Sequence, residues 1–169
     1  MIKNILYTAF LLLSLLVVGA QDKTFSEEVL VDTFMDLEGK EISFKEILKQ
    51  QEGKPILLDI WASWCKDCIV GMPVLEQIKN EYPEAAYIYI SLDKTKESWE
   101  QGIDRFQLKK GFHYWAQKGV ESELFSAIEL DWIPRYMVLN KTGEITLYKA
   151  INANNKKIIK QLRKLTDEK

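Results

Sequence analysis

Two cysteines three positions apart are the residues of this 169-residue chain whose types and spacing could do chemistry. Cys65 and Cys68, the only cysteines, are separated by Lys66 and Asp67 and follow the apolar run 55–61. If a buried strand turns into a helix here, Cys65 lies at the helix N-terminus, where free N–H groups and the helix dipole favour a thiolate. The pattern predicts disulfide exchange with another molecule: Cys65 attacks, and Cys68 resolves the mixed disulfide.

The two residues between the cysteines act on a thiolate in opposite directions. A cation such as Lys66 stabilises the thiolate and an anion such as Asp67 opposes it, so the reduction potential does not follow from the sequence. Both could instead be exposed turn residues, and Asp67 could act as an N-terminal helix charge. A purely structural disulfide is another alternative, although closing so short a loop stabilises a fold little.

One acidic residue interrupts the apolar run before the cysteines. A carboxylate in a central strand costs free energy unless it is paired or protonated. Strand alternation places Asp59 on the same face as Trp61, which we expect to be the face toward the helix carrying Cys68. We therefore predict that Asp59 is a buried proton acceptor with a raised pKa near the resolving thiol. The alternative is an aspartate at a frayed strand edge.

The first twenty residues differ from the rest of the chain. Lys3 precedes an almost wholly apolar stretch, residues 5–18, and small residues follow up to Ala20. This pattern predicts a signal peptide, 1–20, that is cleaved after Ala20 and leaves an exported, periplasmic or otherwise extracytoplasmic domain, 21–169. An uncleaved membrane anchor is the alternative, but the apolar stretch is short against the roughly 20 residues of a span.

The composition is that of one ordinary globular domain. Hydrophobic residues make up 47% and charged residues 28%, and the length predicts a single unit. Loss of Lys3 with the leader lowers the 23 basic residues to 22, against 25 acidic ones, a net charge of −3. Nothing in this balance indicates a nucleic-acid surface, which would need clustered positive charge. We expect a monomer with no cofactor beyond the cysteine pair and no metal.

Hydrophobic periodicity predicts that strands and helices alternate after the leader. Strands are expected at 29–34, 42–44, 56–61, 86–92, 112–115, 135–139 and 145–148. Helices are expected at 69–78 with a kink at Pro73, at 99–106, 124–128 and 158–165, and as a short turn from Phe44. The residues 140–143 are typical of a hairpin turn. This order predicts an α/β fold in which helices flank a mixed sheet.

With these elements and the cysteine pair, the chain resembles the thioredoxin superfamily. The stretch 58–68 is similar to the strand that leads into that family's active site, and Pro73 to its helix-kinking proline. Ile133-Pro134 is similar to its cis-proline loop, and 140–144 to the hairpin turn that follows. The resemblance covers nearly all of the mature chain and implies a thioredoxin-like fold, with a central mixed β-sheet flanked by helices.

Two features resemble one branch of this superfamily, the exported TlpA/ResA-type thiol-disulfide oxidoreductases. Asp93 and Pro134 are 41 positions apart, a longer connection than in thioredoxin itself, and 99–115 supply an inserted helix and strand. The leader and an N-terminal β-hairpin agree with that branch. The chain departs from the usual pattern at Lys66-Asp67, where a proline is common, so the partner and the redox potential are open.

The resemblance implies that the protein reduces disulfides in substrate proteins and receives electrons from a membrane-borne thiol donor. The predicted catalytic residues are Cys65, Cys68 and Asp59. The residues predicted to contact the substrate are Trp64, Lys66, Asp67, Ile133 and Pro134. The Ile133-Pro134 bond is expected to be cis, and the Ile133 backbone could pair with an extended substrate segment.

Four other functions are alternatives to reduction. Within the same class, the pair could oxidise thiols or isomerise disulfides. A peroxidase of the peroxiredoxin type would need proline and threonine where the chain has Leu58 and Ala62, so that pattern is absent. A metal-binding redox chaperone could use the two cysteines and the lone histidine, His113. A zinc site would need a second ligand pair, which the sequence does not contain.

Overall fold

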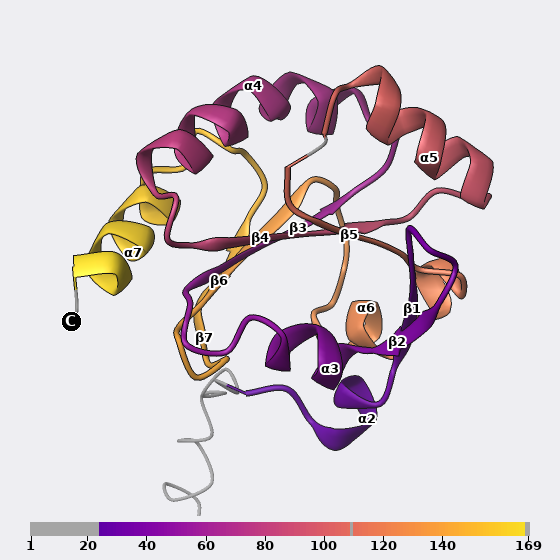
Figure 1. Ribbon diagram of the computed structural model, residues 1–169, viewed down its shortest axis with the longest axis horizontal. Helices are drawn as coiled ribbons and strands as arrows, with labels where there is room; N and C mark the ends of the chain where they lie inside the picture. The colour runs from indigo at the N-terminus through magenta and orange to yellow at the C-terminus, as the bar shows by residue number, and fades with distance from the viewer. Residues whose placement is uncertain (1–23, 109, 168–169) are drawn as a thin grey trace, which may run out of the picture.

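The computed structural model describes residues 24–108 and 110–167, and they form a sheet between two layers of helices (Figure 1). The strands are β1 (Thr33–Asp36), β2 (Glu41–Ser43), β3 (Ile56–Trp61), β4 (Ala86–Ser91), β5 (Phe112–Trp115), β6 (Arg135–Leu139) and β7 (Ile145–Ala150). The helices are α2 (Glu27–Leu30), α3 (Phe44–Lys49), α4 (Lys66–Glu81), α5 (Lys96–Arg105), α6 (Glu123–Ala127) and α7 (Lys156–Asp167), with a 3-10 turn, η1, at Gly119–Glu121. The predicted leader, 1–20, lies outside the described residues.

The strands of this part of the chain form one seven-stranded sheet in the order β2-β1-β5-β4-β3-β6-β7. β3 and β4 are parallel, as are β4 and β5, whereas β6 and β7 are antiparallel to their neighbours. β1 and β2 form the predicted N-terminal hairpin. The inserted unit is α5 with β5, and β5 joins that hairpin to the centre of the sheet. The predicted fold class is confirmed.

The central strand β3 separates two apolar cores. All six of its residues are buried, as predicted for a strand covered on both faces. Leu57 and Trp61 belong to the core under α4, α5 and α7, whereas Leu58 and Ile60 belong to the core over α2, α3 and α6. Figure 1 shows α4 and α5 on one side of the sheet and α2, α3 and α6 on the other. Odd-numbered residues of β3 therefore face one core and even-numbered residues face the other.

The predicted first strand, 29–34, was wrong in its first half. Residues 27–30 form helix α2 instead, and the strand begins at Thr33. Glu27 and Glu28 stand in the first turn, where acidic side chains are favourable next to the helix N-terminus. Val29 is the buried residue of this helix. The apolar side chain that suggested a strand therefore enters the core from a helix.

The predicted strand 42–44 also ends too late. Phe44 is the first residue of α3, because Ser43 caps that helix. The Glu46 backbone N–H donates to Ser43 Oγ, and the Glu46 carboxylate accepts from the Ser43 backbone N–H. This reciprocal capping box accounts for the short helix that was expected from Phe44.

The remaining elements match their predicted positions with small shifts at the ends. β4 ends at Ser91, β7 continues to Ala150, and α4 continues through Pro73 to Glu81. Among the residues that the structure describes, no helix combines the length and the apolarity that crossing a bilayer would need.

Candidate active site

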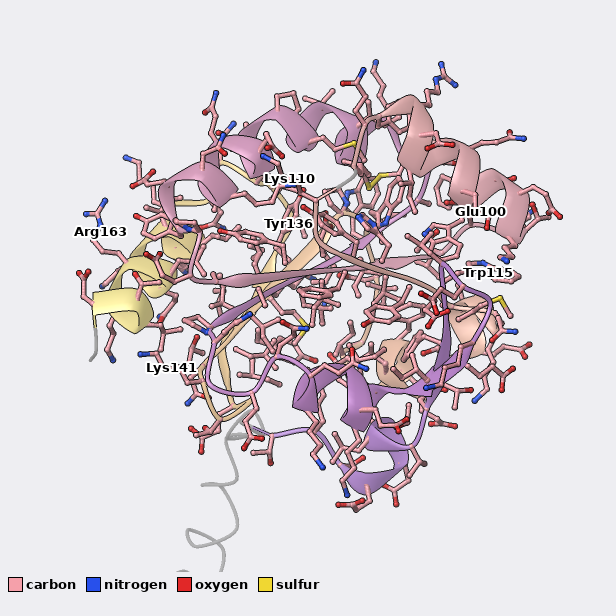
Figure 2. The ribbon with its side chains drawn as sticks, viewed as in Figure 1. Glu100, Lys110, Trp115, Tyr136, Lys141 and Arg163 are labelled. Carbon is pink, nitrogen blue, oxygen red and sulfur yellow. A yellow bond between two sulfur atoms is a disulfide. The ribbon has the colours of Figure 1, made fainter. Side chains whose placement is uncertain are left out.

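The two cysteines lie where β3 gives way to α4. Cys65 is the N-cap residue of α4, and Cys68 is in its first turn. The two sulfurs are joined in a disulfide, and both residues are buried. Figure 2 draws this bond in yellow near the start of α4. The Cys68 backbone N–H points at Cys65 Sγ over 3.1 Å, so it would stabilise a thiolate on Cys65 after reduction. The predicted helix N-terminus is confirmed.

The cis-proline loop lies directly against the first cysteine. The Ile133-Pro134 bond is cis, as predicted. The carbonyl oxygen of Ile133 is 3.6 Å from Cys65 Sγ. Ile133 is half-buried and Pro134 is buried at the start of β6, which pairs antiparallel with β3. The fold therefore brings together residues that are far apart in sequence, and the Ile133 backbone lies within reach of a group bound at Cys65.

Three of the residues predicted to contact substrate are open to solvent. Trp64 is 64% exposed, and Lys66 and Asp67 are exposed at the start of α4. Exposure is what substrate contact needs, and it is equally what a simple turn residue shows. Their part in substrate binding stays a prediction.

A groove of about 630 Å³ opens beside the active-site loop. Trp64, Val120, Trp132 and Ile133 are among the residues that line it. Val120 is 78% exposed and Trp132 is 56% exposed, so two large apolar side chains stand in solvent in the groove that Trp64 also lines. Sequence reasoning did not single out Val120 or Trp132. The position of Trp132 immediately before Ile133 was the available signal.

Asp59 lies in the core below α4. It is 4% exposed, and burial raises its pKa well above the ordinary value. Its Oδ1 has no hydrogen-bond partner within the described residues. Leu57 and Trp61, which share its strand face, pack in the same core as Cys68. The predicted burial, raised pKa and strand face are confirmed, and its role as proton acceptor stays a prediction.

Two tyrosines flank Asp59 on the neighbouring strands. Tyr89 pairs with it from β4 and Tyr136 from β6. Figure 2 places Tyr136 between the sheet and α4. A Cβ added at Gly71 would lie 2.8 Å from the Tyr136 hydroxyl, so glycine at this position lets the ring fit under the helix. Aromatic walls of this kind keep water from Asp59 and account for its raised pKa.

The lone histidine is part of this wall. The His113 ring stacks on Tyr89 with a centroid distance of 4.8 Å and an interplanar angle of 8°. Burial lowers the pKa of His113 to about 4, so its ring is neutral near pH 7. Among residues 24–108 and 110–167, no three His, Cys, Asp or Glu side chains are grouped as metal ligands would be.

The turn that leads into Cys65 is held by a residue that sequence reasoning did not place in the site. Asp93, just after β4, accepts hydrogen bonds from the backbone N–H and the hydroxyl of Ser63. Parallel strands end at the same edge of a sheet, and polar residues after neighbouring strands β3 and β4 meet there. That placement was the signal that could have identified Asp93.

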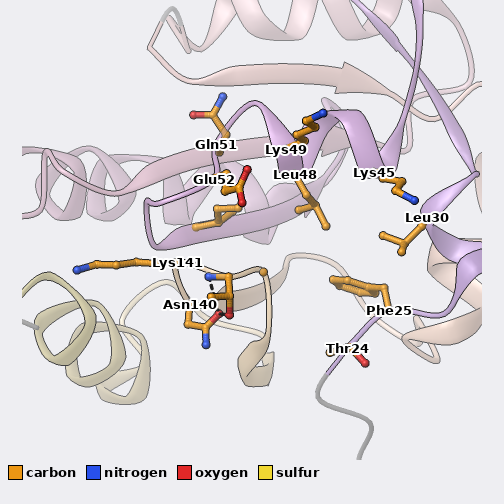
Figure 3. Close-up of a pocket in the computed structure, with 13 residues that line it drawn as sticks. Thr24, Phe25, Leu30, Lys45, Leu48, Lys49, Gln51, Glu52, Asn140 and Lys141 are labelled. Atoms are coloured by element: carbon orange, nitrogen blue, oxygen red, sulfur yellow. Dashed lines mark hydrogen bonds between the residues drawn. The ribbon is translucent and has the colours of Figure 1, made fainter.

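A second cavity of about 510 Å³ lies away from the cysteines, between α3 and the turn after β6 (Figure 3). Phe25 and Leu48 form part of its apolar lining, and Lys45 and Lys49 stand at its edge. None of the residues predicted for catalysis or substrate contact lines it.

Known proteins resemble the chain in both sequence and structure. A family model described as thioredoxin-like matches residues 53–145. The thiol-disulfide oxidoreductase ResA of Bacillus cereus is 28% identical over 112 residues, which cover 65% of this chain and 60% of ResA. The thioredoxin-like protein YneN of Bacillus subtilis is 32% identical over 68 residues, 38% of this chain and 40% of YneN. The chain therefore matches about 60% of the length of the curated ResA relatives.

Two solved structures share the fold. The solution structure of a proposed thiol-disulfide oxidoreductase from Bacteroides vulgatus has a TM-score of 0.66 at 27% identity, covering 80% of this chain and 86% of that one. A secreted Mycobacterium tuberculosis disulfide oxidoreductase has a TM-score of 0.64, covering 83% of this chain and all of its own. Its identity is 18%, so it supports the fold alone.

Proposed function

Because the chain belongs to the thioredoxin-like family, we propose that it is a thiol-disulfide oxidoreductase that reduces disulfides in other proteins through Cys65 and Cys68. The observation that carries the proposal is the position of Cys65. Its sulfur stands at the N-terminus of α4, beside the Cys68 N–H and the Ile133 carbonyl. A sulfur at a helix N-terminus is favoured as the thiolate, which is the attacking species.

The reaction balances over two exchange steps. The Cys65 thiolate attacks one sulfur of the substrate disulfide, forms a mixed disulfide and releases the other sulfur as a thiolate. Cys68 then attacks Cys65 Sγ, and the substrate leaves with its second sulfur reduced. The Cys65-Cys68 disulfide in the structure is the product of this second step. Two electrons have passed from the protein to the substrate.

Asp59 would take the proton that Cys68 loses in the second step. Leu57 and Trp61, which share its strand face, pack in the same core as Cys68, and its unpaired Oδ1 leaves it free to receive a proton. Its raised pKa makes the ionised form a stronger base than an ordinary aspartate. No cofactor beyond the cysteine pair takes part in this scheme.

The substrate is proposed to be an extended protein segment. The Ile133 backbone is next to Cys65, so a segment that carries the attacked disulfide could pair with it as an added strand. The groove lined by Trp64 and Trp132 would then receive side chains that flank the substrate cysteine. Lys66 and Asp67 would contact the substrate at the helix end.

We further propose that the protein is exported and works as a monomer that is re-reduced by a membrane-borne thiol donor. The leader pattern at 1–20 supports export. N-terminal sequencing of the protein from its own cells tests this proposal, with Gln21 as the expected first residue.

The direction of exchange is tested by the reduction potential of the pair, measured by equilibration with glutathione. A reductant of this fold is expected near the thioredoxin value of about −270 mV, and an oxidase near about −120 mV. A value at the oxidising end would overturn the reductive direction in favour of thiol oxidation. The companion assay is turnover of a protein disulfide such as that of insulin, with dithiothreitol as the electron source.

A further inference from the structure

A buried carboxylate holds the loop that ends in the attacking cysteine. Asp93 is 2% exposed and lies just beyond the carboxyl end of β4. Its Oδ1 accepts from Ser63 Oγ at 2.6 Å, and its Oδ2 accepts from the Ser63 backbone N–H at 3.0 Å. Ser91 Oγ donates to Oδ2 at 2.7 Å. Ser63 is two residues before Cys65, so these bonds fix the position of the backbone that leads into the nucleophile.

The inserted helix closes the other side of the same loop. A Cβ added at Gly102 of α5 would lie 2.6 Å from the Ser63 Cβ and 3.2 Å from the Trp61 ring. The indole N–H of Trp115 in β5 donates to the Asp93 carbonyl over 2.7 Å. Asp93 and Ser63 are therefore held by the α5 and β5 insertion as well as by the central sheet. The loop has little freedom to shift without breaking these contacts.

The charge of Asp93 is not neutralised by a nearby cation. Within the described residues, no lysine, arginine or histidine forms an ion pair with it. Exposed Lys66 and Asp67 on α4 and buried Asp59 in β3 are other charged groups of this region. The groove that Asp93 and Trp64 line also holds Lys94, Lys118, Glu121 and Asp131. Lys66 and Asp67 oppose each other and are screened by water. Asp93 is screened far less because it is buried.

We propose that Asp93 is a positioning residue for Cys65, whose hydrogen bonds fix the Ser63 loop and whose negative charge keeps the cysteine pair a stronger reductant. A buried negative charge that is bonded to the loop two residues before the sulfur disfavours the thiolate and so disfavours the reduced form. A pair whose reduced form is less stable gives up its electrons more readily. This inference rests on the proposed exchange reaction at Cys65.

The test compares wild type with Asp93→Asn in two measurements that need no protein substrate. The first is the pH dependence of Cys65 alkylation by iodoacetamide in the reduced protein. The second is the equilibrium with oxidised glutathione, which takes two electrons from the dithiol and becomes two thiols. Asp93→Asn keeps an oxygen for the Ser63 N–H and removes the charge. We expect the Cys65 titration midpoint to fall by about one pH unit, and glutathione to oxidise the pair several-fold less completely.

Three further variants separate charge from structure. Asp93→Glu keeps the charge and is expected to restore the wild-type titration. Ser63→Ala removes the hydroxyl bond alone, so it should lower the free energy of unfolding and leave the titration in place. Glu97→Gln removes one exposed negative charge from the first turn of α5 and should change neither measurement.

An Asp93→Asn titration and glutathione equilibrium equal to wild type, with lowered stability alone, would overturn the inference. An upward shift of the midpoint would overturn it as well. If the amide variant does not fold, Asp93→Ser supplies a smaller neutral side chain for the same readouts. Failure of wild type to reduce insulin would instead count against the proposed function, because neither Asp93 measurement involves a protein substrate.

Discussion

Two buried aspartates in different regions of the molecule differ in their hydrogen-bond donors. Asp32, between α2 and β1, has a fully buried side chain that accepts from Lys118 Nζ at 2.8 Å, Ser122 Oγ at 2.5 Å and the Leu124 N–H at 3.3 Å. Asp59, under α4, has an Oδ1 with no partner within the described residues. The same residue type is thus saturated with donors in one region and left short of them in the other.

The pKa of each group follows from that difference. Burial alone would raise the pKa of Asp32, but the hydrogen bonds from Lys118 and Ser122 outweigh it and lower the pKa. Burial acts without such opposition on Asp59, whose pKa rises well above the ordinary value. A carboxylate that is permanently charged and bonded serves as a structural link. A carboxyl group whose pKa is raised by burial is suited to proton transfer.

The largest effect on activity is expected at the cysteines, which the proposed role of Asp59 serves. Cys65→Ser should abolish reduction of insulin, because the attacking sulfur is gone. Cys68→Ser should still attack but should accumulate a mixed disulfide, because no second thiol releases the substrate. Non-reducing gel electrophoresis with mass spectrometry measures the adduct. Failure of the Cys68→Ser variant to form an adduct with any disulfide protein would contradict the assigned order.

The second-largest effect is expected when the ionisable carboxyl group of Asp59 is replaced by an amide. Asp59→Asn should slow substrate release by at least about 10-fold and flatten its dependence on pH, because the proton acceptor is lost. Stopped-flow measurement of release from pH 6 to 9 checks this. A release rate and pH profile equal to those of wild type would remove Asp59 from the mechanism.

Stability should change with Asp59 in the opposite direction to activity. The folded-state pKa of Asp59 is raised, so its contribution to stability is complete below the ordinary pKa of 3.8 and is lost as pH rises toward the folded value. Asp59→Asn should therefore unfold at higher denaturant concentration than wild type near pH 8, by on the order of 2 kcal/mol. Urea titrations at several pH values measure the difference.

Asp32→Asn should show the reverse behaviour. Loss of a buried carboxylate bonded to Lys118 should lower the free energy of unfolding by about 2 kcal/mol at pH 7, with insulin reduction per folded molecule unchanged. The folded-state pKa of Asp32 is lowered, so its stabilisation is present above the ordinary value of 3.8 and lost as pH falls below it. A large loss of turnover in this variant would show that the two regions are coupled.

The smallest effect is expected at the groove rim. Trp132→Ala should raise KM for a protein disulfide a few-fold and leave kcat in place, because the side chain would contact substrate away from the sulfurs. Val31→Ala, which also removes an exposed apolar side chain, is the matched control on another part of the surface. Equal KM values for the two variants would take the groove out of substrate binding.

Much of the site could be predicted from the sequence because its signals are local. The continuous apolar run 56–61 predicts a buried strand, and the cysteine spacing places both thiols in one turn of the helix that follows. Asp59 stands out because a charge interrupts that run, and strand parity decides which core it faces. These properties depend on neighbouring residues alone. The early error at 29–34 arose because four residues are too few for a helical period to be recognised.

The tertiary structure alone decided what surrounds the attacking sulfur. The Ile133 carbonyl oxygen lies 3.6 Å from Cys65 Sγ although 68 positions separate the two residues. Asp93 accepts a hydrogen bond from Ser63, which is 30 positions away. Such contacts depend on how the ends of β3, β4 and β6 meet at one edge of the sheet. The hydrophobic period reports which face of an element is buried, but it does not report which polar side chains meet there. Burial and missing donors, which set the proton affinity of Asp59, exist only once the chain is packed.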